Sequence, residues 1–96
     1  MNTENALLML KQRLNRLPGD TTLDDYLTAR INSTIEQLEQ TGIVLDPESV
    51  SDLLLVVDMA AWQYLNRDKP GAMPDWLRLQ RRERWVNQEV AENAAG

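Results

Sequence analysis

The segment from Val50 to Leu65 limits the possible folds of this chain most strongly, because as a helix it is apolar around most of its circumference. Such a helix lies at the centre of its fold, or is covered on its second side by another subunit. The longest uninterrupted apolar run, Leu53 to Val57, is far too short to cross a membrane. We therefore expect a buried central helix surrounded by other helices, and no membrane as a partner.

Two further helices are predicted before this segment. Apolar residues spaced three and four apart predict a helix over residues 3–17, which Pro18-Gly19 ends. A second stripe predicts a helix over residues 22–41, with Thr22 opening a variant capping box and Gly42 as the stop. The stripes consist of Leu7, Leu10, Leu14 and Leu17, and of Leu27, Ile31, Ile35 and Leu38.

Prolines mark the starts of the third and fourth helices. Asp46-Pro47-Glu48 combines a capping residue, a first-turn proline and an acid, which predicts a helix over residues 47–66. Pro74 similarly predicts a fourth helix over residues 74–89, after a polar loop that contains Pro70-Gly71.

The length of 96 residues predicts one domain, residues 1–96. We expect the all-α class, as a small bundle of about four helices joined by short loops. The small and polar residues 90–96 predict a frayed C-terminal tail.

The chain contains neither cysteine nor histidine, which removes thiolate nucleophiles, imidazole bases and the usual zinc ligands. The glycines are isolated, so no phosphate-binding loop is present. Capping and solvated helix faces account for the neighbouring acids Asp24-Asp25 and Glu36 with Glu39. We expect no enzyme, no catalytic residues, no cofactor and no metal. The polar segment Met1 to Asn5 lacks basic residues and predicts no signal peptide.

Asp58 is the least expected residue of the central segment, since it lies between apolar neighbours. A buried carboxylate without a partner is costly, so Asp58 must reach water or a cation. Two interpretations stay open: Asp58 faces a solvated groove, or it pairs with an arginine of another helix or another subunit. The candidate partners are Arg30, Arg78, Arg81 and Arg84.

The fourth predicted helix carries the only basic cluster of the chain, at positions 78, 81, 82 and 84. On a helix, positions 78, 81, 82 and 85 share one side, with 77 and 84 beside it. Tryptophan and arginine are enriched at protein interfaces, and the net charge of −5 disfavours nucleic acid as the partner. We therefore predict a protein interface formed by Asp58, Trp76, Leu77, Arg78, Arg81, Arg82 and Trp85.

The order of these features resembles the head–tail connector (neck adaptor) proteins of tailed bacteriophages and prophages. The resemblance rests on residues 60–69 (AAWQYLNRDK), on Met73-Pro74 and on residues 76–84 (WLRLQRRER). Residues 34–43 (TIEQLEQTGI) agree with the second helix of that family, and the similarity covers about residues 5–86.

The resemblance implies a structural virion protein of the phage neck, made in the host cytoplasm during viral assembly. Copies would form a homo-oligomeric ring, expected to be twelve-fold, below the portal. The ring would bind the portal protein and the next neck or tail-completion protein, and DNA would pass through its lumen only as cargo. In such adaptors the C-terminal helix commonly engages the portal, which would give Trp76, Leu77, Arg81 and Trp85 a role.

Two alternatives belong to other classes of protein. The fourth helix could act as the recognition helix of a small DNA-binding module, with its arginines on phosphates. The chain could also be a small dimeric chaperone or regulator of phage assembly.

Overall fold

The computed structural model describes residues 1–69 and 71–95, and four α-helices with no strand account for the regular structure in these ranges. They are α1 (Thr3–Arg13), α2 (Asp24–Gln40), α3 (Val50–Leu65) and α4 (Asp75–Ala95). The predicted all-α class with four helices is therefore confirmed. Pro70 of the predicted loop and Gly96 of the predicted tail lie outside the described residues.

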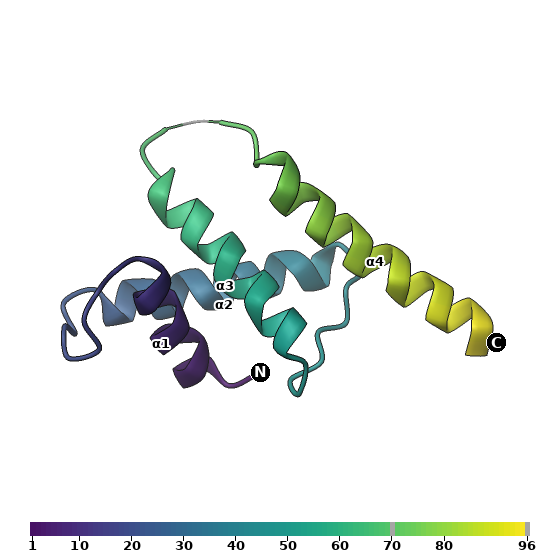
Figure 1. Ribbon diagram of the computed structural model, residues 1–96, viewed down its shortest axis with the longest axis horizontal. Coiled ribbons are helices and arrows are strands. Elements are labelled where there is room, and N and C mark those ends of the chain that lie inside the picture. Colours follow the sequence, from purple (N-terminus) through teal and green to yellow (C-terminus); the bar gives the residue numbers. More distant parts are fainter. Residues whose placement is uncertain (70, 96) are drawn as a thin grey trace.

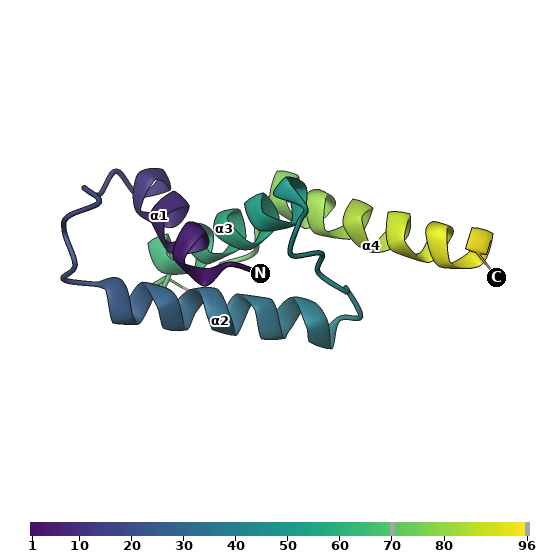
Figure 2. The ribbon, with the colours of Figure 1, turned by 90° about the horizontal axis from the view of Figure 1, so that it is seen from below.

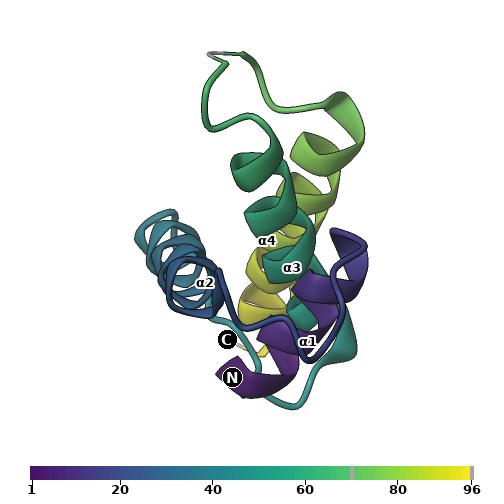
Figure 3. The same cartoon turned by 90° about the vertical axis from the view of Figure 1, so that its left-hand side faces the viewer.

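Helices α1, α2 and α3 contact one another in every pairing, whereas α4 contacts only α3 among the described helices (Figures 1 and 2). The C-terminal part of α4 extends beyond the other three helices, which gives the molecule dimensions of 47 × 29 × 19 Å. An end-on view separates α2 from the pair formed by α3 and α4 (Figure 3). The fold is thus a three-helix unit with a fourth helix attached along one side of α3.

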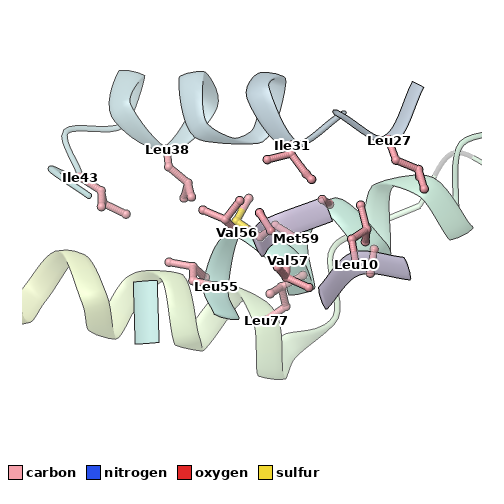
Figure 4. Close-up of a cluster of buried hydrophobic side chains, with 13 residues drawn as sticks. Leu10, Leu27, Ile31, Leu38, Ile43, Leu55, Val56, Val57, Met59 and Leu77 are labelled. Atoms are coloured by element: carbon pink, nitrogen blue, oxygen red, sulfur yellow. The ribbon is translucent and has the colours of Figure 1, made fainter. Parts of the chain in front are cut away.

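The core confirms the expectation that α3 is central. Six apolar residues of α3 are buried, and they belong to one cluster with buried residues of α1, α2 and α4 (Figure 4). The chain's own helices therefore cover most of the apolar circumference of α3, with no second subunit needed for that purpose. Leu77 is the only residue of α4 in the cluster of buried hydrophobic residues, within the part of the chain whose burial is described.

Helix α1 ends earlier than predicted, at Arg13 instead of residue 17. Asn15 adopts a left-handed conformation with φ 59°. The N–H of Arg16 donates to the carbonyl of Lys11 at 2.8 Å, and that of Asn15 donates to Gln12 at 3.1 Å. These two bonds form a Schellman motif, in which asparagine takes the place that glycine usually occupies. The helix is therefore finished before Pro18-Gly19 is reached.

Helix α2 ends near the predicted position, and Gly42 is the stop that the sequence indicated. Its φ is 95°, and the N–H of Ile43 donates to the carbonyl of Leu38 at 3.2 Å. Leu38 and Ile43 are both buried, which is the apolar contact that accompanies a Schellman motif. This end of α2 fixes the direction in which residues 43–45 leave towards α4.

The predicted starts of α2 and α3 are wrong by two or three residues. The N-cap of α2 is Leu23, which has no side-chain cap hydrogen bond, and Asp20 forms a turn before the helix by accepting from the N–H of Thr22 at 3.1 Å. Asp46 accepts from the N–H of Glu48 at 2.9 Å and so forms a turn before α3. The cap of α3 is Ser49, whose hydroxyl accepts from the N–H of Asp52 at 3.2 Å.

Helix α4 is longer than predicted. It begins at Asp75 and continues to Ala95, so residues 90–95, which were expected to form a frayed tail, are helical. No proline or glycine occurs between Asp75 and Ala95 to interrupt the helix. The additional turns belong to the part of α4 that extends beyond the other helices (Figure 1).

Candidate functional site

The attachment of α4 depends on a charged pair across the α3–α4 contact. Arg84 donates from Nε to Oδ1 of Asp52 at 2.7 Å and from Nη2 to Oδ2 at 3.1 Å. The Asp52 side chain is only 3% exposed, and Oδ2 also accepts from the N–H of Asp46 at 2.8 Å. Such a two-pronged contact between guanidinium and carboxylate fixes orientation as well as distance. Arg84 therefore sets the rotation of α4 about its own axis.

Two polar side chains of α4 also hold the chain between α2 and α3. Arg84 Nη2 donates to the carbonyl of Val44 at 2.7 Å. Gln88 accepts from the N–H of Val44 at 2.8 Å and donates to the carbonyl of Gly42 at 2.6 Å. Together Arg84 and Gln88, which we call the polar anchor, satisfy backbone groups that no helix or sheet would satisfy. Helix α4 is thus attached by Leu77 and the polar anchor.

The pKa values of this pair follow from its surroundings. Burial by itself raises the pKa of Asp52, but hydrogen bonds from Arg84 and the Asp46 N–H, with the charge of Arg84, outweigh it. The pKa of Asp52 therefore lies below its ordinary value. The hydrogen bond to Asp52 raises the pKa of Arg84 above its already high value. Both groups are charged at neutral pH, as an ion pair requires.

The structure separates the residues that the sequence grouped on the fourth helix. Leu77 is fully buried in the core, so it holds α4 in place and is not available as a surface contact. Trp76 and Trp85 are nine residues apart, about two and a half helical turns, and lie on opposite sides of α4. Apart from Leu77, the predicted interface residues of α4 therefore belong to two exposed surfaces, one on the side of Trp85 and one on the side of Trp76.

The first surface is a groove between α4 and the end of α2, with a volume of about 390 Å³. Trp85 closes one wall, and its Nε1 comes to within 3.5 Å of the position that a Cβ on Gly42 would occupy. Arg78 forms an ion pair with Asp75 at 2.7 Å, and it is exposed. We call this the arginine groove; its lining residues are Thr41, Ile43, Arg78, Arg81, Arg82 and Trp85.

The second surface is an apolar stripe that faces away from the rest of the molecule. Its residues follow at intervals of three, seven and four, which places them on one side of α4. Their exposed fractions lie between 40% and 61%. We call this the outer stripe; it consists of Trp76, Leu79, Val86 and Val90.

Asp58 forms no ion pair with any of these residues of α4. Its Oδ1 lies 3.8 Å from Nε of Arg13 on α1, and the Asp58 side chain is 23% exposed. Burial raises the pKa of Asp58, and the charge of Arg13 only partly opposes this. Within the chain, Asp58 therefore faces Arg13 of α1, and the expected partners Arg30 of α2 and Arg78, Arg81 and Arg84 of α4 are wrong as partners of the same copy. The buried acid that meets an arginine of α4 is Asp52.

Sequence reasoning missed Asp52, Gln88 and, apart from Trp76, the residues of the outer stripe. Asp52 has the pattern of an ordinary first-turn acid, and nothing local marks it as buried. A signal for the polar anchor was present, since positions 77, 84 and 88 share one side of a helix. That spacing places Arg84 and Gln88 on the side of Leu77, but it also fits Arg81, which follows Leu77 by four residues, so it does not by itself single out Arg84.

None of the described helices is long and apolar enough to cross a membrane. Residues 1–69 and 71–95 also contain no group of three or more Asp and Glu side chains placed to hold a metal ion. Comparison with known proteins finds no matching family model, no matching curated protein and no matching solved structure.

Proposed function

We propose that this chain is a structural virion protein, a head–tail connector that assembles as a ring under the portal of a tailed bacteriophage. The observation that carries the proposal is the outer stripe, four large apolar residues on a helix that extends beyond its own fold. Monomeric proteins rarely leave such stripes uncovered, and tryptophan is common at interface hot spots. The resemblance of residues 60–84 to neck adaptors is the reason for proposing the portal as the partner.

The manner in which α4 is held supports this function. Its attachment uses one buried leucine and the polar anchor, so two sides of the helix remain free for other molecules. A connector needs separate surfaces for its own copies, for the portal and for the next neck protein. Helix α4 offers two of these surfaces, the outer stripe and the arginine groove.

The test is binding to the portal protein encoded beside the gene of this chain. We expect the wild-type chain to form a ring on the portal that is visible by electron microscopy. The double variant Leu79→Ser and Val90→Ser should weaken portal binding by about tenfold or more, since two apolar side chains lose their burial. The matched control replaces Leu17 and Val50 with serine; these are also exposed but lie outside α4. No binding of the wild-type chain to the portal overturns the proposal.

The arginine groove supports a second candidate function, binding of duplex DNA. Arg78, Arg81 and Arg82 line one face, as contacts to phosphates require. Retention of duplex DNA that falls with salt, and is lost when Arg81 and Arg82 become glutamate, would support this alternative. No retention at low salt eliminates it.

A further inference from the structure

The arginine groove has charge that the chain itself does not neutralise. Within the described residues, Arg81 and Arg82 form no ion pair and no hydrogen bond through their side chains, and the partner of Arg78 is the exposed Asp75. Trp85 and Ile43 add apolar walls beside the guanidinium groups. Guanidinium groups bind carboxylates in a planar, two-pronged geometry. The groove therefore fits a protein surface that carries carboxylates next to short apolar or polar side chains.

A surface of this chemistry exists on α2 of the same chain. Asp25, Asn32, Glu36 and Glu39 are exposed and spaced by seven, four and three residues, so they share one side of the helix. None of the three acids forms an ion pair among the described residues. We call these four residues the acidic stripe. The region around it is also acidic, with nine acids and a single arginine between residues 20 and 58.

The spacing of the charges agrees between the two surfaces. Arg78 and Arg82 are one helical turn apart, as are Glu36 and Glu39. Both intervals correspond to about 5–6 Å between Cβ atoms. Two helices lying side by side can therefore place consecutive arginines opposite consecutive carboxylates.

The signs of the two surfaces restrict which contacts between copies are favourable. A contact of groove with groove would place arginine against arginine, and one of acidic stripe with acidic stripe would place acid against acid. A contact of groove with acidic stripe brings opposite charges together, and in its head-to-tail form it produces closed rings or open filaments, as the proposed connector requires. We propose that the arginine groove of one copy binds the acidic stripe of α2 in the next copy. This inference rests on the proposed ring-forming function, for which it names the subunit contact.

Charge reversal tests the contact. One variant carries Arg81→Glu and Arg82→Glu, and a second carries Glu36→Arg and Glu39→Arg. Association is measured by analytical ultracentrifugation at low salt, alone and with the portal ring. We expect each variant alone to associate at least about tenfold more weakly than wild type. An equal mixture of the two variants restores association, because alternating copies again oppose unlike charges.

The matched control for the arginine variant is Arg67→Glu with Lys69→Glu. It changes the net charge by the same amount as Arg81→Glu with Arg82→Glu, at exposed positions outside both surfaces. This control should associate as wild type does. Unchanged association of the two test variants, or a mixture that fails to recover, overturns the contact. A wild-type chain that stays monomeric both alone and with the portal ring overturns it as well.

The two proposals fail in different ways. If both charge variants still form rings on the portal, the connector function stands and the contact is wrong. If the wild-type chain does not bind the portal but the mixture recovers association in solution, the contact stands and the function is wrong. If duplex DNA binds the wild type, and only the Arg81 and Arg82 variant loses it, the groove belongs to nucleic acid and the contact is overturned.

Discussion

Two aspartates on α3 show how burial and hydrogen-bond partners shift the pKa of the same residue type in opposite directions. Asp52 is buried and receives two donors from Arg84 and one from the Asp46 backbone. Asp58 is partly exposed and has one distant cation, 3.8 Å away. The first carboxylate is stabilised by the fold, while the second is held in its charged form at some cost.

Replacement of these two residues by alanine should lower the free energy of unfolding by different amounts. Asp52→Ala leaves the partly buried Arg84 without its carboxylate partner and should lower the free energy of unfolding by about 2–3 kcal/mol. Asp58→Ala removes a weak pair and should change it by less than about 0.5 kcal/mol. Urea denaturation at pH 7 measures both. Equal losses for the two variants would contradict the assignment of Asp52 as the structural acid.

At the scale of elements, the ends of α1 and α2 use the same backbone motif with different residues. Asn15 and Gly42 both adopt positive φ, and the N–H groups after them return to helix carbonyls. The difference matters because a side chain is strained in this conformation, and glycine has none. At Gly42 an added Cβ would be in ordinary van der Waals contact with Trp85, so the positive φ alone disfavours a side chain there.

Gly42→Ala should lower the free energy of unfolding by about 1–2 kcal/mol, because the added Cβ disfavours the left-handed conformation. Gly19→Ala is the control. It has no atom within 4 Å of the added Cβ and no positive φ, so it should be neutral or slightly stabilising. Thermal unfolding followed by circular dichroism measures both changes. A loss at Gly19 as large as that at Gly42 would show that the conformation of Gly42 is not the cause.

At the scale of the whole molecule, stability should depend on pH through carboxylates whose pKa values are shifted by the fold. Hydrogen bonds from Thr22 and then from Arg16 lower the pKa of Asp20 to about 2. The pKa of Asp52 is also lowered, whereas that of Asp58 is raised. A lowered pKa in the folded state stabilises the fold above the unfolded value, near pH 4, and a raised pKa has the opposite sign.

We therefore expect the midpoint of urea unfolding to fall as the pH is lowered from about 4 towards 2, as the folded carboxylates take up protons. Above pH 4, Asp58 should act in the opposite direction and make the protein slightly more stable as the pH falls from neutral. Asp52→Asn should reduce the fall of the unfolding midpoint between about pH 4 and pH 2. Asp58→Asn should remove the small rise of the midpoint as the pH falls from neutral. A midpoint that is constant between pH 2 and pH 7 would contradict the shifts of all three residues.

The sequence by itself determined the helical class, the order of the four helices and the central place of α3. These follow from local periodicity and from breakers such as Gly42, which act within a few residues of the chain. The tertiary structure decided which side of α4 is buried, and hence that Arg84 and Gln88 point inward while Trp76 and Trp85 are exposed. It also decided that Asp52 is the buried acid and that Asn15 and Ser49 set helix ends. The burial of a side chain depends on where other helices lie, and the spacing of residues within one helix does not contain that information.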